Sequence, residues 1–287
     1  MKQDLTAMIL AAGLGTRLQS LTHDRPKALV ELNGKPLLQH CIENLISNDF
    51  HHIVINVHHY GEQIIDFVSQ HHFDADIAIS DERDLLMDTG GGIIKATSLF
   101  KDSKAVLVHN VDIISNVDFM TLGQQFLDSG DDAWLLTQDR ETNRKLMFDE
   151  KSQLVGWMNK AEGLYKWVHP EGSALRQAQG PQQIQDQGSQ QMQDQGSQQM
   201  QAQGPQQTQA HGAALQYKEM AFSGLHFFRS DLFNPFEEKP QSVIDLYLHL
   251  AQHNRILSKP IQPDYWFDLG KPEQLQAAET FLKTQRP

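Results

Sequence analysis

Two glycines and two basic residues near the start of the chain have types and spacings suited to binding a polyphosphate. Gly13 and Gly15 follow a short apolar run, residues 7–10, which is predicted to be a buried strand. Because glycine lacks a Cβ, a loop at this position can turn tightly and bring backbone N–H groups close to a ligand. Arg17 and Lys27 would add two positive charges. A glycine loop with two cations after a buried strand indicates a phosphate-binding site.

This loop differs from the two commonest glycine-rich nucleotide motifs. The dinucleotide fingerprint Gly-x-Gly-x-x-Gly needs a third glycine where this chain has Leu18. A Walker-type loop, Gly-x-x-x-x-Gly-Lys-Ser/Thr, is absent from the sequence. A plain strand-to-loop turn that needs only small residues is a further alternative. The presence of Arg17, Pro26 and Lys27 at these spacings disfavours it.

Residues 10–27 resemble the signature of the sugar-1-phosphate nucleotidyltransferases. The matching positions read Leu10-Ala11-Ala12-Gly13-x-Gly15-Thr16-Arg17-Leu18-x-x-Leu21-Thr22-x-x-x-Pro26-Lys27. Enzymes of this family join a nucleoside triphosphate to a sugar 1-phosphate and release pyrophosphate. The resemblance implies that the nucleotide is bound by Ala11, Ala12, Gly13, Gly15, Thr16, Arg17, Lys27 and Asn110.

The resemblance also implies separate roles for the two cations. Arg17, with the backbone of Gly15 and Thr16, would hold the β- and γ-phosphates, and Lys27 would neutralise charge near the α-phosphate. Nucleotidyl transfer depends mostly on positioning and electrostatic stabilisation. No nucleophilic side chain is required, because the sugar phosphate attacks directly. The catalytic candidates are Arg17, Lys27 and Asp112.

Two aspartates are the candidate ligands of a magnesium ion. Asp112 follows the apolar run 105–109, at the carboxyl end of a predicted strand, and the family has a metal-binding aspartate there. Asp268 lies in the segment Trp-Phe-Asp-Leu-Gly at 266–270, which resembles the segment with the family's second metal aspartate. Mg²⁺ prefers one or two carboxylates together with substrate oxygens. A turn aspartate that caps the next helix is the alternative for Asp112.

A run of three glycines follows Asp88 and Thr89 and precedes an apolar helical pattern that begins at Ile93. It suggests close approach of the backbone to a ligand at a helix N-terminus, and a flexible hinge is the alternative. The motif is most similar to the N-acetylmuramate 1-phosphate uridylyltransferase branch of the family, and some heptose and mannose 1-phosphate guanylyltransferases carry related versions. The candidates for substrate binding are Asp88, Thr89, Gly90, Gly91, Asn159, Ser223 and Gly224.

Strand-like and helix-like runs alternate through the first half of the chain. Strands are predicted at residues 7–10, 53–57, 77–80, 105–109 and 133–137, and helices at 37–48, 61–70, 93–100 and 119–129. Farther along, strands are predicted at 219–228 and 266–272 and helices at 242–253 and 272–283. This rhythm predicts a mostly parallel sheet with helices on both faces. The resemblance implies an α/β fold with one Rossmann-like, doubly wound mixed sheet of the nucleotide-diphospho-sugar transferase type.

Bulk composition excludes some functions and favours a location. The net charge of −12 over 287 residues argues against a nucleic-acid or membrane-surface binder. Cys41 is the only cysteine, the first residues lack the features of a signal peptide, and no run of about 18 apolar residues occurs. We therefore expect a cytoplasmic protein. The sequence leaves its oligomeric state open, with a monomer or a dimer as the two alternatives. Zinc binding by the paired histidines is disfavoured, because neighbouring residues on a strand point to opposite faces.

Residues 178–209 form four tandem octads rich in glutamine and glycine. Almost nothing in them could form a core, so residues 176–214 are predicted to be a disordered insertion within a single nucleotidyltransferase domain spanning 1–287. A glutamine-rich interaction segment is the alternative.

Together these patterns predict a magnesium-dependent enzyme of nucleotide-sugar biosynthesis. The expected substrates are a nucleoside triphosphate, with UTP the first choice, and a sugar 1-phosphate such as N-acetylmuramate 1-phosphate, which would place the enzyme in cell-wall metabolism. One alternative is a guanylyl- or cytidylyltransferase for another phosphorylated sugar or alcohol. Another is a non-catalytic protein that binds nucleotide sugars on the same fold, although the intact cations and aspartates argue against it.

Overall fold

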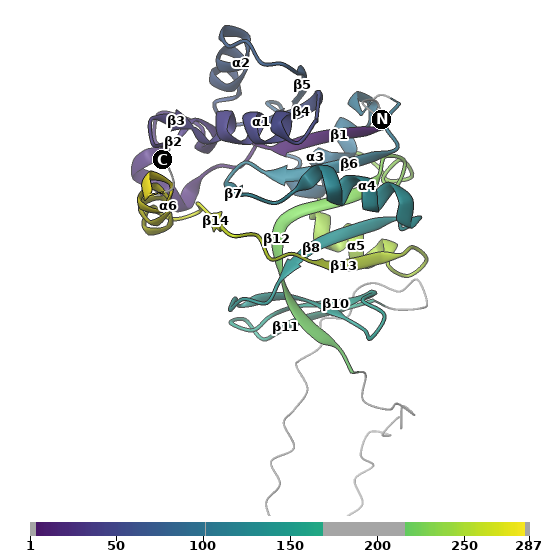
Figure 1. Ribbon diagram of the computed structural model, residues 1–287. Coiled ribbons are helices and arrows are strands. Elements are labelled where there is room, and N and C mark those ends of the chain that lie inside the picture. Colours follow the sequence, from purple (N-terminus) through teal and green to yellow (C-terminus); the bar gives the residue numbers. More distant parts are fainter. Residues whose placement is uncertain (1–3, 101, 169–215, 285–287) are drawn as a thin grey trace, which may run out of the picture.

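A ten-stranded mixed sheet forms the centre of the computed structural model, which describes residues 4–100, 102–168 and 216–284 (Figure 1). The strands follow the order β11-β10-β9-β12-β6-β1-β4-β5, and β8 pairs with both β12 and β13. Their bounds are β1 (Leu5–Leu10), β4 (His52–Val57), β5 (Asp76–Asp81), β6 (Ala105–Asn110), β8 (Ala133–Gln138), β9 (Arg144–Phe148), β10 (Leu154–Asn159), β11 (Leu164–Trp167), β12 (Lys218–Arg229) and β13 (Ile256–Pro260).

The direction of the strands decides where a ligand can bind. β1 runs parallel to β4 and β6, and β4 runs parallel to β5, so the carboxyl ends of all four strands meet at one edge. In such sheets ligands sit beyond this edge. β12 is antiparallel to β6, with Leu225 opposite His109. The residues of β12 just before Leu225 therefore reach the same edge.

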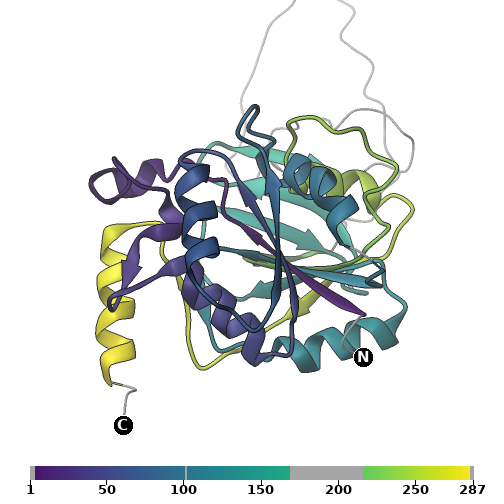
Figure 2. The same ribbon diagram turned by 90° about the horizontal axis from the view of Figure 1, so that it is seen from above.

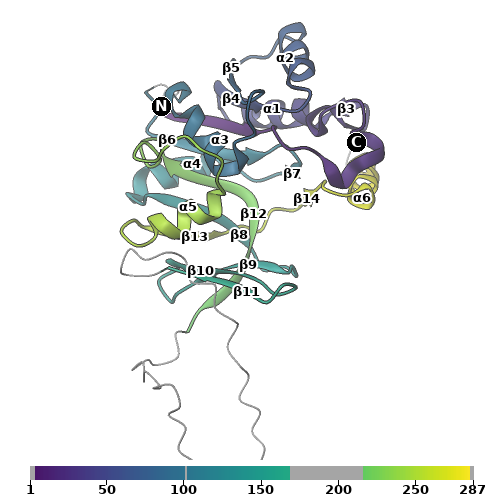
Figure 3. The same cartoon turned by 180° about the vertical axis from the view of Figure 1, so that it is seen from behind.

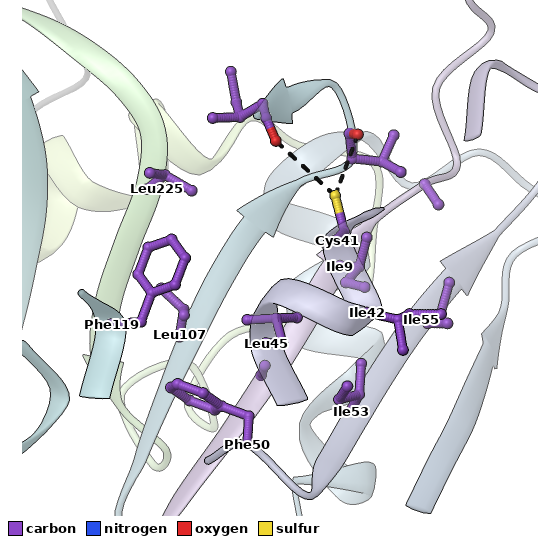
Figure 4. Packing of buried hydrophobic residues seen from close by; sticks show 14 of the residues in the cluster. Ile9, Cys41, Ile42, Leu45, Phe50, Ile53, Ile55, Leu107, Phe119 and Leu225 are labelled. Carbon is purple, nitrogen blue, oxygen red and sulfur yellow. Dashed lines mark hydrogen bonds between the residues drawn. The ribbon is translucent and has the colours of Figure 1, made fainter. Parts of the chain in front are cut away.

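Helices cover both faces of the sheet, as the front, top and back views show (Figures 1–3). Ile9 and Leu107 belong to one core cluster, and the alternate residues Met8 and Val108 belong to another. The first cluster includes side chains of α1 (Leu37–Ser47), α2 (Gly61–Gln70) and α4 (Phe119–Ser129), and the second includes those of α3 (Asp88–Ala96) and α5 (Val243–Leu250). The close-up of the first cluster shows α1 lying over the strands (Figure 4). The expected α/β fold is confirmed.

The C-terminal segment closes one side of the molecule. β14 (Trp266–Asp268) pairs antiparallel with β7 (Ile113–Ser115), and α6 (Pro272–Thr284) then packs beside the hairpin of β2 (Glu31–Leu32) and β3 (Lys35–Pro36) (Figures 1 and 2). A third apolar cluster fills this junction and includes Leu18, Leu32, Leu269 and Leu275. The first glycine loop is followed by two short 3-10 helices, η1 (Thr16–Leu21) and η2 (Lys27–Leu29).

The structure differs from the sequence expectations in two places. The run Gly90-Gly91-Gly92 lies inside α3 rather than before it, because the backbone N–H groups of Gly90 and Gly91 donate to Gln241 O and the helix begins at Asp88. The strands β2, β3, β7, β9, β10, β11 and β13 were not predicted. In β9, β11 and β13, charged or polar residues interrupt the apolar pattern.

β9, β10 and β11 form one end of the molecule, away from α2 (Figures 1 and 3). The rings of Trp167, at the end of β11, and Tyr217, just before β12, lie in an edge-to-face contact with their centroids 5.5 Å apart. The predicted insertion at 176–214 lies outside the described residues. Within the described part of the chain, no helix combines the length and the apolar character that crossing a bilayer would need.

Replacing Gly91 by alanine should destabilise the fold. A Cβ on Gly91 would collide with the backbone carbonyl oxygen of Lys239 and lie 3.1 Å from the Cβ of Met87. Overpacking of this kind costs about 1–3 kcal/mol, more than the 0.5–1 kcal/mol or so that alanine gains over glycine within a helix. The free energy of unfolding, measured by urea denaturation, should fall in Gly91→Ala. Gly13→Ala is the matched control, since no heavy atom lies within 4 Å of its Cβ position. Equal stability of both variants and the parent protein would contradict this packing account.

Candidate functional site

A cavity of about 440 Å³ lies at the carboxyl ends of β1 and β6, where the sheet topology places a ligand. Every residue predicted to bind the nucleotide lines it: Ala11, Ala12, Gly13, Gly15, Thr16, Arg17, Lys27 and Asn110. Asp112, Asp88 and Thr89 line it as well. The sequence candidates from the first 112 residues of the chain thus largely surround one hollow.

The shape of the glycine loop follows from contacts at Gly15. This residue has a φ of 65°, in the left-handed region that glycine adopts without strain. Its carbonyl oxygen accepts hydrogen bonds from the Thr22 hydroxyl (3.1 Å) and from the backbone N–H of Leu18 (3.0 Å). A Cβ on Gly15 would lie 3.0 Å from the Thr22 methyl group, whereas one on Gly13 would meet open space. Gly15 therefore closes the loop, and Gly13 leaves room beside the cavity.

A buried asparagine holds the start of this loop. Asn56, at the carboxyl end of β4, is 2% exposed, and its Oδ1 accepts hydrogen bonds from the backbone N–H groups of Ala11 (2.7 Å) and Ala12 (3.3 Å). Its Nδ2 donates to Glu82 Oε1 (2.7 Å), and Glu82 Oε2 accepts from the backbone N–H of Met87 (3.2 Å). The Asn56–Glu82 pair thus connects the glycine loop to the segment that precedes α3.

Sequence reasoning missed both members of this pair. Asn56 is a polar residue inside an otherwise apolar strand, and Glu82 directly follows β5, so both stand at the carboxyl ends of parallel strands. Their position at the carboxyl ends of parallel strands, where ligands bind, could have identified them from the sequence. Glu82 is fully buried, and its burial raises the pKa of the carboxyl group above the usual 4.5.

Lys27 and Asp112 form an ion pair at the cavity wall. The Lys27 ammonium group donates to Asp112 Oδ2, and the two side chains are only 10% and 14% exposed. Lys27 begins η2, and Asp112 follows β6, so residues from two distant segments meet here. A little-exposed pair of this kind places a fixed positive group and an oxygen ligand side by side, which suits the binding of a phosphate and a cation.

The pairing of β14 with β7 brings Asp268 close to Asp112 along the backbone. Asp268 lies opposite Ile113, and the backbone N–H of Leu269 donates to the Asp112 carbonyl oxygen (2.8 Å). The Asp268 carboxylate accepts from the backbone N–H of Gly270 (2.9 Å) and does not itself line the cavity. The Arg17 guanidinium group rests against Gly270, where a Cβ would lie 2.8 Å from Cζ.

The donor chemistry of the two aspartates fits a hard divalent cation. Both offer carboxylate oxygens, and their backbones are neighbours in a paired ribbon. No group of three or more His, Cys, Asp or Glu side chains with metal-binding geometry occurs among the described residues.

Of the predicted substrate-binding residues, only Asp88 and Thr89 line the cavity. Gly90 and Gly91 are buried against residues 239–242 and do not line the cavity, unlike Asp88 and Thr89. The Ser223 hydroxyl donates to Leu136 O (2.8 Å), and Gly224, with a φ of 79°, packs against the Asn110 side chain. Asn159 is 3% exposed and its Oδ1 has no hydrogen-bond partner within the described structure.

Comparisons with known proteins bear on the family and the fold of the chain. Residues 6–146 match the family model described as Nucleotidyl transferase. The N-acetylmuramate alpha-1-phosphate uridylyltransferase of Caulobacter vibrioides is 28% identical, over 96% of this chain and 96% of its own length. The protein of that name from Neisseria meningitidis serogroup B is 38% identical over 40% of this chain and 50% of its own length. The crystal structure of HddC from Yersinia pseudotuberculosis complexed with GMP-PN is similar with a TM-score of 0.65 and 19% identity, covering 96% of this chain and 99% of that one.

Replacing Glu82 by glutamine should alter how stability depends on pH. Above the usual glutamate pKa of 4.5, the unfolded chain releases this proton before the folded chain does, because burial raises the folded pKa. Glu82 therefore lowers the free energy of unfolding progressively as pH rises from 4.5 through its folded pKa. Glu82→Gln should therefore become more stable relative to the parent protein as pH rises from 4.5 to 7, because only the parent protein loses unfolding free energy through this group. Urea denaturation at a series of pH values measures it, and a difference that stays constant with pH would refute this assignment.

Proposed function

This chain belongs to the nucleotidyl transferase family, and we propose that it transfers a uridylyl group from UTP to N-acetylmuramate 1-phosphate or a closely related sugar 1-phosphate. The products are the UDP-sugar and pyrophosphate. The observation that carries the proposal is the Lys27–Asp112 ion pair in the wall of a cavity that the glycine loop also lines. The similarity to the Caulobacter uridylyltransferase over nearly the whole of both chains supports the choice of nucleotide and sugar.

In the proposed reaction the acceptor's phosphate oxygen attacks the α-phosphorus of UTP in line with the bond to the β-phosphate. One phosphorus–oxygen bond forms, one breaks, and pyrophosphate leaves. The loop at Gly13 gives the triphosphate room to approach the backbone. Arg17, supported by Gly270, holds the outer phosphates, and Lys27 neutralises charge at the α-phosphate. Positioning and charge stabilisation of this kind supply most of the catalysis in phosphoryl chemistry.

A magnesium ion would be held by Asp112 and Asp268 together with oxygens of the substrates. Such an ion would neutralise phosphate charge and orient the reacting groups. Asp112 keeps Lys27 in place at the cavity wall, and the backbone bond from Leu269 keeps Asp112 itself in position. We further propose that residues 1–287 work as one nucleotidyltransferase domain that carries the sequence 176–214 as an insertion.

A direct test mixes the full chain with each of four nucleoside triphosphates and with N-acetylmuramate 1-phosphate or other sugar 1-phosphates. Pyrophosphate release should be fastest with UTP and N-acetylmuramate 1-phosphate, and it should stop after EDTA treatment and resume on addition of Mg²⁺. If pyrophosphate were released only with a nucleoside triphosphate other than UTP, that nucleotide would replace UTP in the proposed reaction. No release with any pair would overturn the enzymatic function.

Replacing Lys27 by alanine should reduce kcat by about 100-fold or more, the effect typical of removing one charge-stabilising donor from an active site. Lys27→Arg keeps the positive charge and separates loss of charge from loss of fold. Lys35→Ala is the matched control, because Lys35 is an exposed lysine that pairs with Glu43 outside the cavity. Thermal denaturation shows whether each variant is folded. A folded Lys27→Ala protein with near-normal kcat would refute the proposed role.

A further inference from the structure

Arg140 carries a positive charge that no carboxylate of the described structure neutralises at close range. It follows β8 and is partly buried, yet it forms no ion pair within 4 Å among the described residues. Its Nε is buried and has no hydrogen-bond partner there. Taking a guanidinium group out of water without a counter-charge is unfavourable, so such a group usually serves a bound anion.

The other contacts of Arg140 fix its orientation without satisfying its charge. Its Nη2 donates to the backbone carbonyl oxygen of Phe222 (3.1 Å), and its Cζ lies 4.6 Å from the centre of the Trp266 ring. The Trp266 indole N–H donates in turn to Ser223 O (3.2 Å). This cation–π contact holds the guanidinium group in place. Arginine can bind an oxyanion through two parallel N–H donors.

Arg140 lies beside the candidate metal-binding segment but outside the nucleotide cavity. Trp266 is two residues before Asp268 on β14. Burial lowers the pKa of Arg140, and the Asp268 charge opposes that shift only in part. Arg140 and Trp266 do not line the cavity that the glycine loop forms. The buried Nε of Arg140 thus lies unpaired outside the cavity that the glycine loop lines.

We propose that Arg140 forms an oxyanion subsite for the acceptor substrate. The subsite binds a phosphate or carboxylate oxygen of the incoming sugar 1-phosphate. This inference rests on the proposed function. Trp266 positions the guanidinium group, and the bound anion supplies the counter-charge that no carboxylate within 4 Å of Arg140 provides among the described residues. Because Arg140 lies outside the nucleotide cavity, it acts on acceptor binding and not on UTP binding.

The test compares Arg140→Gln with the parent protein in steady-state kinetics. The KM for the acceptor should rise by about tenfold or more, in keeping with loss of a hydrogen bond to a charged group, while the KM for UTP changes less than twofold. Two acceptors separate the sources of the anion, because N-acetylmuramate 1-phosphate carries a carboxylate and N-acetylglucosamine 1-phosphate does not. If the KM of Arg140→Gln rises for both acceptors, the subsite binds the phosphate. If it rises only for N-acetylmuramate 1-phosphate, the subsite binds the carboxylate.

Two variants act as controls for fold and charge. Arg144→Gln removes an exposed arginine at the start of β9 and should leave both KM values unchanged. Arg140→Lys keeps the charge but not the two-pronged donor, and should restore acceptor binding in part. An unchanged acceptor KM in folded Arg140→Gln, or an equal rise in the KM for UTP, overturns the subsite.

Calorimetric titration separates failure of the subsite from failure of the proposed function. N-acetylmuramate 1-phosphate is titrated into the full chain with a nonhydrolysable UTP analogue and Mg²⁺ present. If the parent protein binds the acceptor more tightly than Arg140→Gln but releases no pyrophosphate, the subsite stands and the enzymatic function fails. If the parent protein turns over and both proteins bind equally, the function stands and the subsite is wrong. Absence of binding to the parent protein rejects the subsite.

Discussion

β7 and β14 are only three residues long each, yet their pairing assembles the candidate site. It places Asp268 opposite Ile113 and lets the backbone of Leu269 donate to Asp112. The same ribbon carries Gly270 to Arg17 and Trp266 to Arg140. Every one of these contacts joins segments far apart in the sequence. The ribbon is held by the apolar cluster beneath α6, so packing of the last helix and geometry of the site are linked.

Behind the cavity, polar groups rather than apolar ones set the shape of the glycine loop. Asn56 Oδ1 accepts hydrogen bonds from two backbone N–H groups of the loop, and Asn56 Nδ2 donates to Glu82. A buried network of this kind is favourable only while each member stays paired, since an unpaired buried group costs about 1–3 kcal/mol. The loop is consequently fixed before a ligand arrives, which reduces the entropy lost on binding.

The sequence was sufficient to predict the sheet-and-helix pattern and the residues of the first loop. Strands such as β1 and β6 are continuous apolar runs, and the loop motif is local, so neither depends on distant contacts. The position of the glycine run within α3 was not predictable, because the segment around Gln241 determines it. Arg140, Asn56 and Glu82 were missed for the same reason. Each has an ordinary residue type, and its importance arises from burial and from partners far along the chain.

The contact between Trp167 and Tyr217 has a consequence for how the gene product can change in length. Because the two rings touch, two described residues that flank residues 169–215 in the sequence lie next to each other in the fold. Even for a fully flexible connection, each doubling of its length would add only about 0.6 kcal/mol of loop-closure entropy. Duplication of an octad between these two residues would therefore add little loop-closure cost to the fold.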